Sequence, residues 1–193
     1  MKWCKYFIVN LNAGDDAARR HTAVWRQRYQ IPYHRCFGFG VPSGPDCIPL
    51  YPLSSTSLAA VDRFSKLIVV SHANACRINS WTPLELAERL RAWGLKEVGL
   101  IAFKACHVGQ ASYLDELAGC LAGLGVRFGW LIGYRGLAEL FAYSLGEFHE
   151  VTNVEDLILR GLGVKLPDFL RIRLVRGNIP VNNLLSYRFM QSS

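Results

Sequence analysis

The chain has 193 residues, of which 51% are hydrophobic and 19% are charged. This balance is typical of a folded globular protein and excludes a disordered one. No apolar run approaches ~20 residues, so no transmembrane helix is expected, and the N-terminal segment lacks the features of a secretory signal. The six cysteines include no CxxC pair, which argues against a zinc site and for thiols in a reducing compartment. We expect a single domain over residues 1–193, with no metal.

The net charge of +7 is concentrated near the C-terminus. The segment 160–193 contains six basic residues and one acidic residue, and therefore contributes +5 of the +7. A charge gathered in one segment favours an anionic partner, such as a polyphosphate, a nucleic acid or a membrane surface.

Strands and helices are expected to alternate through the first two thirds of the chain. Strands are predicted at 3–11, 33–39, 66–71, 98–105 and 126–132, and helices at about 15–29, 82–94 and 110–124. Asp15 or Asp16 can cap the first helix, and Thr82-Pro83 is typical of the start of the second. Strands joined through single helices pair in parallel, with the helices packed on the sheet faces. The sequence therefore predicts an α/β fold: a mostly parallel central sheet flanked by helices in three layers.

The pattern changes after residue 132. Residues 137–145 fit either a helix or a strand, and 153–160 fit a short helix. Apolar and polar residues alternate over 169–176 and again over 184–189, on either side of a turn at Gly177-Asn178. We expect a C-terminal β-hairpin with a basic face.

A histidine and a cysteine each follow a predicted strand. The first strand runs into His72 in the sequence LIVVSHA, and the second runs into Cys106 in LIAFKACHVG. In a parallel sheet, functional groups gather just beyond the carboxyl ends of the strands. Alone, either residue could be structural, but consecutive strands would bring both to the same edge.

A thiolate beside a histidine is a nucleophile for acyl transfer, because the imidazole accepts the thiol proton. Backbone N–H groups must also stabilise the oxyanion that develops. The amides of Cys106 and Ala73 are the candidates for this role. His107 is a rival base, but neighbouring side chains in an extended segment point apart, so His72 is preferred.

These features resemble the caspase-type cysteine peptidases of clan CD, in which a histidine follows one strand and the cysteine follows the next. They are most similar to the self-processing cysteine protease domains of MARTX and clostridial glucosylating toxins (peptidase family C80-like). The resemblance covers roughly residues 60–190 and is carried by LIVVSHA, TPLELAERL, LIAFKACHVG, IGYRGLAELFAYSLGEFHE and FLRIRLVRGN. One departure is Ala73, where that family usually has glycine.

The resemblance implies a caspase-like cysteine endopeptidase with a C-terminal flap, activated by inositol hexakisphosphate bound on a basic surface. It further implies a secreted bacterial effector or toxin that acts on proteins in the host cytosol, with leucine before the scissile bond. The basic residues that match this surface are Arg171, Arg173, Arg176 and Arg188, with Lys165 and Arg135 less directly matched.

Two other functions fit the sequence. The chain could be a catalytically silent caspase-like module that binds a polyanion or a partner protein. It could also be a basic nucleic-acid-binding domain, which is less favoured because the basic residues belong to no recognised nucleic-acid-binding motif.

Overall fold

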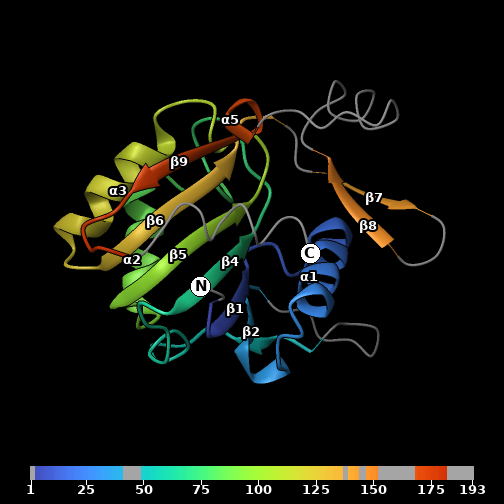
Figure 1. The fold of residues 1–193 in the computed structure, drawn as a ribbon. Coiled ribbons are helices and arrows are strands. Elements are labelled where there is room, and N and C mark those ends of the chain that lie inside the picture. The colour runs from blue at the N-terminus through green and yellow to red at the C-terminus, as the bar shows by residue number, and fades with distance from the viewer. Residues whose placement is uncertain (1–2, 41–48, 137–138, 144–146, 152–167, 182–193) are drawn as a thin grey trace.

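A computed structural model describes residues 3–40, 49–136, 139–143, 147–151 and 168–181. Within them, seven strands form one sheet in the order β3-β2-β1-β4-β5-β6-β9 (Figure 1). The strands are β1 (Lys5–Asn10), β2 (Cys36–Gly38), β3 (Tyr51–Pro52), β4 (Ser65–Val70), β5 (Glu97–Lys104), β6 (Arg127–Tyr134) and β9 (Ile172–Arg176). All neighbours pair in parallel except β6 and β9, which are antiparallel. The predicted α/β class with a mostly parallel sheet is confirmed.

Helices cover both faces of this sheet. Helix α1 (Asp16–Arg28) packs through Trp25 on the face that carries Ile68 and Val70 of β4. Helices α2 (Pro83–Ala92) and α3 (Tyr113–Gly123) pack on the opposite face. The split follows from strand geometry, because successive side chains of a strand point to opposite faces.

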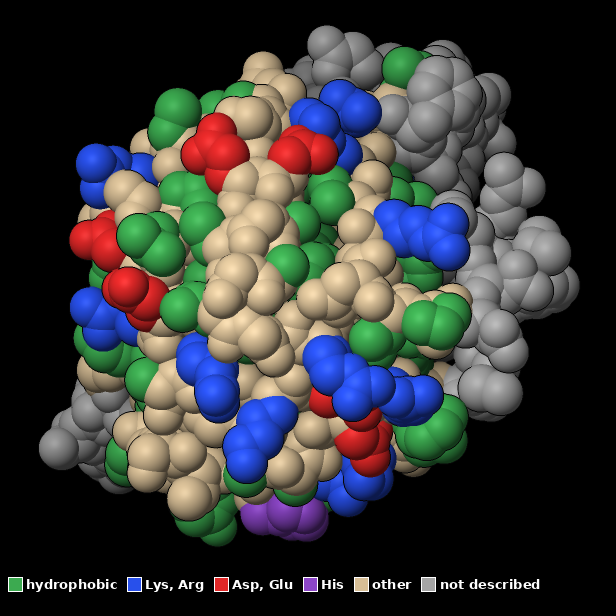
Figure 2. All heavy atoms as spheres, turned by 90° about the vertical axis from the view of Figure 1, so that its left-hand side faces the viewer, with side chains coloured by type: hydrophobic (Ala, Val, Ile, Leu, Met, Phe, Trp, Pro, Cys, Tyr) green, Lys and Arg blue, Asp and Glu red, His purple; other side chains and the backbone are tan. Residues whose placement is uncertain are grey.

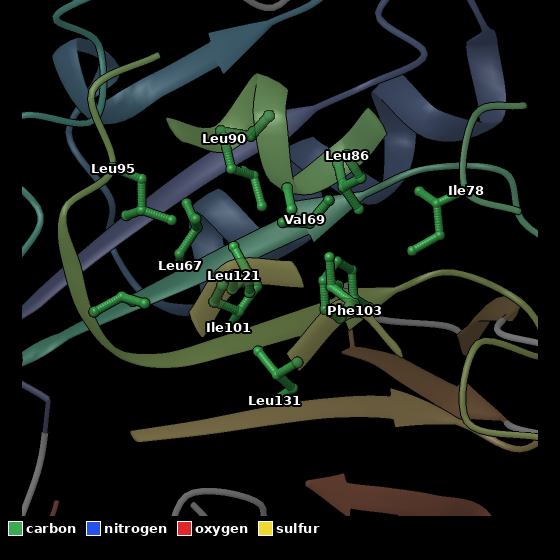
Figure 3. Close-up of a cluster of buried hydrophobic side chains, with 14 of the residues drawn as sticks. Leu67, Val69, Ile78, Leu86, Leu90, Leu95, Ile101, Phe103, Leu121 and Leu131 are labelled. Carbon is green, nitrogen blue, oxygen red and sulfur yellow. The ribbon is translucent and has the colours of Figure 1, made fainter. Parts of the chain in front are cut away.

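The larger core lies between the sheet and the pair α2 and α3. Its close packing is visible in Figure 3, where side chains of the two helices meet those of β4, β5 and β6. The residues at this contact include Leu67, Val69, Leu86, Leu90, Ile101, Phe103, Leu121 and Leu131. Helix α2 starts with a capping box, in which Thr82 and Glu85 each bond the backbone N–H of the other.

The apolar run of strand β5 ends in a charged residue, Lys104, which is buried. Its ammonium group lies 3.9 Å from the ring centroid of Trp25 and bonds the hydroxyl of Tyr134. Burying a charge is costly unless it is paired, and aromatic faces and hydroxyls provide such partners. Lys104 thereby connects α1 to β5 and β6.

The C-terminal part of the fold differs from the predicted strands. Residues 169–176 were expected to form one strand, but the chain forms a helical turn, α5 (Asp168–Arg171), before β9 begins at Ile172. The alternation of apolar and polar residues therefore predicts the strand only from Ile172 onward. Strand β9 pairs with β6, while the expected partner at 184–189 and the helix at 153–160 lie outside the described residues.

Other boundaries also shift. Residues 33–39 begin with a 3-10 turn, η1 (Tyr33–Arg35), before β2, and the third helix begins at Tyr113 rather than near 110. Residues 137–145, which the sequence left open, include strand β7 (Glu139–Tyr143), which pairs with β8 (Glu147–Val151) as an antiparallel hairpin.

The face carrying α2 and α3 has basic and acidic side chains interspersed rather than one patch of a single sign (Figure 2). In the part of the chain that is described, no helix is both long and apolar enough to cross a membrane.

Candidate active site

The sheet brings His72 and Cys106 to one edge at the same register. Strands β4 and β5 are hydrogen-bonded neighbours, and Val70 pairs with Lys104 as the last residue of each strand. His72 and Cys106 each follow two residues after these strand ends. Adjacent strands are about 4.8 Å apart, which brings residues at equal register within reach of one another.

A carboxylate from α1 completes the site on the His72 side. Asp15 is the N-cap of α1, and its Oδ1 accepts a hydrogen bond from the Ala18 amide at 2.8 Å. The same oxygen lies 3.0 Å from Nε2 of His72, whose side chain is 60% exposed. The pKa of Asp15 is held below its ordinary value chiefly by the Ala18 hydrogen bond and further by His72. The imidazole therefore faces an ionised carboxylate at neutral pH.

This contact also selects the histidine tautomer. A neutral imidazole that donates from Nε2 to a carboxylate retains a lone pair on Nδ1. Nδ1 is thus the nitrogen of His72 that can accept a proton from a thiol.

The backbone of His72 is held by the side chain of Asn12 and by the backbone of the loop that contains Asn79. Its N–H donates to Oδ1 of Asn12 at 2.9 Å, and its carbonyl accepts from the Asn79 amide at 3.0 Å. Ser71 Oγ lies 2.8 Å from both Asn12 Oδ1 and the His72 carbonyl oxygen.

The loop that carries Cys106 is fixed by the end of β6. The amides of His107 and Gly109 donate to the carbonyls of Gly136 and Tyr134 at 2.8 and 2.7 Å. The Cys106 side chain remains partly exposed, as a reactive thiol requires.

The rival base, His107, lies in a turn with φ of +56° rather than in an extended segment. The premise that its side chain points away because the chain is extended is therefore wrong. Its Nδ1 is nevertheless buried and bonds no atom among the described residues. His72, with an exposed ring and a carboxylate partner, stays the preferred base.

The predicted oxyanion donor Ala73 follows His72 and forms an isolated bridge with Ile78. Its φ lies outside the left-handed region, so alanine is compatible with this backbone position. Within the described part of the chain its amide donates no hydrogen bond. That N–H is therefore available to an oxyanion.

The other described cysteines lack a comparable setting. Burial raises the pKa of the Cys36 thiol to about 11, so it is not a thiolate at neutral pH. Cys4 and Cys76 are exposed, Cys120 lies within α3, and none of them directly follows the end of a strand of the central sheet. The described residues contain no cluster of three or more metal-ligating side chains.

The basic residues predicted to bind a polyanion are only partly brought together. Arg171 is buried, and its carbonyl accepts from the amide of exposed Arg135 at 2.9 Å. Arg173 donates to the Ala111 carbonyl at 2.7 Å and pairs with Asp115 at 2.6 Å. Arg176 is exposed at the far end of β9. Lys165 and Arg188 lie outside the described residues.

Sequence reasoning missed Asp15 and Asn12 as parts of this site. Asp15 was recognised only as a candidate helix cap, and Asn12 was assigned no functional role. The available signal was that Asn12 also follows a strand by two residues, since β1 ends at Asn10 and pairs in parallel with β4.

No protein-family model matches this chain, and neither does any curated protein. Among solved structures it is similar to a secreted C11 cysteine protease from Bacteroides thetaiotaomicron, crystallised with an irreversible peptide inhibitor. The TM-score is 0.41 and the identity 11%, over 69% of this chain and 49% of that one. The chain thus spans about half the length of that protease. The assignment of the site rests on the residues described above and not on this likeness.

Proposed function

We propose that this protein is a cysteine endopeptidase in which Cys106 is the nucleophile and His72 the base. The observation that carries the proposal is the equal register of the two residues beyond paired parallel strands, with Asp15 bound to the far nitrogen of His72. A nucleophile, a base and a group that orients the base form the arrangement that acyl transfer uses.

The reaction follows from these positions. Nδ1 of His72 takes the thiol proton as Cys106 Sγ bonds the substrate carbonyl carbon, and the amides of Cys106 and Ala73 stabilise the oxyanion. The imidazolium then gives its proton to the leaving nitrogen as the C–N bond breaks, which leaves a thioester. Water, deprotonated by His72, attacks the thioester and releases the thiol and the carboxylic acid. Asp15 stabilises the imidazolium that exists between these steps.

Within this class, we propose a caspase-type peptidase of the C80-like kind, acting as a bacterial effector in a host cytosol. Support comes from the motifs around His72 and Cys106 and from a β-strand hairpin, β7 with β8, that follows β6. A preference for leucine before the scissile bond belongs to the same proposal.

We further propose that inositol hexakisphosphate activates the enzyme. Arg173 supports this idea, because its guanidinium bonds the Ala111 carbonyl in the segment between Cys106 and α3. Arg135, which directly follows β6, and Arg176, the last residue of β9, are both exposed and are available to phosphate groups. A polyphosphate that competes with Asp115 for Arg173 would alter the loop that carries the nucleophile.

The decisive experiment uses a peptide electrophile that ends in leucine, with and without inositol hexakisphosphate. We expect the probe to label the native chain and a Cys76→Ala variant, and to leave Cys106→Ala and His72→Ala unlabelled. Cys76→Ala is the matched control, because Cys76 is exposed in the loop that follows His72. Labelling that persists in Cys106→Ala would contradict the assignment of the nucleophile.

Binding measurements made beside the labelling experiment distinguish the alternatives. Binding of the polyphosphate without labelling, in any condition, favours a catalytically silent module. Salt-dependent binding of nucleic acid that is unchanged in Cys106→Ala favours a nucleic-acid-binding domain. Labelling of the native chain at one rate with or without the polyphosphate removes the activation proposal and retains the peptidase.

A further inference from the structure

Three adjacent strands of the sheet, and not two, deliver a polar residue to the candidate site. Strand β1 lies beside β4, and Asn10 at its end pairs with Val70 at the end of β4. Asn12 follows two residues later, at the register of His72 and Cys106. Asn12, His72 and Cys106 therefore follow the ends of β1, β4 and β5, which are consecutive strands in the sheet.

The side chain of Asn12 bonds to a distant segment rather than to its own turn. Its Oδ1 accepts from the His72 amide at 2.9 Å and from Ser71 Oγ at 2.8 Å. Its Nδ2 donates to Oδ1 of Asn79 at 2.8 Å. All three partners belong to the segment 71–79, some 60 residues away, whereas an asparagine that only forms a turn bonds backbone groups within a few residues.

Asn12 is itself fixed from both sides. Its own amide donates to Oδ1 of Asn10 at 2.8 Å, and the buried Asn10 donates to Thr22 of α1 at 2.9 Å. Asn79 has a φ of +47°, a conformation that asparagine tolerates well, and its Nδ2 donates to the Leu11 carbonyl at 3.0 Å.

We infer that Asn12 is a positioning residue for His72, a role that rests on the proposed peptidase function. Asn12 holds the His72 amide while Asn79 and Ser71 contact the His72 carbonyl, so the backbone from which the imidazole projects is held at both ends. Asp15 fixes the far end of the ring. The imidazole is thereby restrained although its side chain is largely exposed. A base must be held to well within 1 Å, because a displacement of that size costs about a hundredfold in rate.

The test compares Asn12→Ala with Asn12→Asp. Aspartate retains an oxygen that can accept from the His72 amide and from Ser71, whereas alanine retains neither hydrogen bond. We expect Asn12→Ala to slow labelling of Cys106 by the leucine electrophile by about 10- to 100-fold per folded molecule, mostly through the maximal rate rather than through probe affinity. Asn12→Asp should recover part of that loss, because its second carboxylate oxygen replaces the Nδ2 that donates to Oδ1 of Asn79.

A second readout does not depend on activity. The His72 amide should be protected from hydrogen exchange in the native chain and in Asn12→Asp, and should lose protection in Asn12→Ala. Thermal unfolding of each variant reports the folded fraction, and Asn12→Asp carries the comparison if Asn12→Ala does not fold. Retained protection in Asn12→Ala, or equal rates in all three chains, would overturn the inference. If the native chain is not labelled at all, the proposed function fails, while exchange still decides whether Asn12 holds His72.

Discussion

Gly109 shows how closely the chain behind the nucleophile is packed. It lies three residues after Cys106, and a Cβ at this position would be 2.6 Å from the Gly133 carbonyl oxygen and 3.0 Å from Cβ of Arg173. Backbone atoms cannot move aside as the end of a flexible side chain can, so only glycine allows the loop to approach β6 and β9 this closely.

Replacing Gly109 by alanine is therefore expected to displace the Cys106 loop. Overpacking of this kind costs about 1–3 kcal/mol of unfolding free energy, and labelling of Cys106 should slow as well. Urea unfolding and labelling kinetics measure the two effects. The matched control is Gly119→Ala in α3, where a Cβ meets nothing within 4 Å, and alanine should stabilise the helix by up to about 1 kcal/mol. Equal behaviour of the two variants would contradict this account.

At the scale of the element, the N-cap residue of α1 has two roles. Asp15 caps the helix through the Ala18 amide and also contacts His72. Asparagine and aspartate are comparable N-caps, whereas alanine is not. Substitutions at this one position therefore separate the structural role from the chemical one.

We expect Asp15→Asn to unfold at pH 7 nearly as the native chain does, and Asp15→Ala to lose about 1 kcal/mol of unfolding free energy. The leucine electrophile should label Cys106 more slowly in both variants than in the native chain, because neither variant holds a carboxylate against His72. Undiminished labelling in Asp15→Asn would exclude the carboxylate from the mechanism.

The contribution of Asp15 to the unfolding free energy should decrease at acidic pH. The folded pKa of Asp15 lies below its ordinary 3.8, so the carboxylate stabilises the fold fully above that value and loses this contribution as the pH falls through the folded pKa. The difference in unfolding free energy between the native chain and Asp15→Ala should shrink on acidification below about pH 4. Urea unfolding measured at several pH values checks the trend.

At the scale of the whole molecule, the site is only as rigid as the packing of helices on the sheet. Helix α2 lies between the His72 loop and β5 in the chain, and it presents Leu86, which is fully buried, to the core. Leu84 of the same helix is 50% exposed. The two leucines therefore form a matched pair on one element.

Leu86→Ala is expected to reduce the unfolding free energy by about 2–5 kcal/mol, because the side chain is lost and a cavity remains. Leu84→Ala should change it by no more than about 0.5 kcal/mol. Urea unfolding of both variants provides the measurement. A large loss at Leu84 would show that its exposed surface is covered by another part of the molecule.

Much of this architecture could be predicted because the signals are local. The Thr82-Pro83 start of α2, the buried run of β4 and the apolar run of β5 each depend on a few consecutive residues. Parallel pairing follows from their alternation. His72 and Cys106 could be placed at a common edge for the same reason. The sequence by itself thus determined the α/β class, the central strands and the two reactive side chains.

Other features depend on contacts between distant residues, and only the tertiary structure decided them. Asp15 meets His72 across 57 residues of chain, and Asn12 meets it across 60, because β1 is inserted beside β4 in the sheet. The position of β9 as an antiparallel strand beside β6 and the burial of Arg171 were likewise visible only in the folded structure. No short pattern encodes such contacts, since strand order results from the packing free energy of the whole sheet and its helices. The residues that orient the proposed base were therefore found only in the folded molecule.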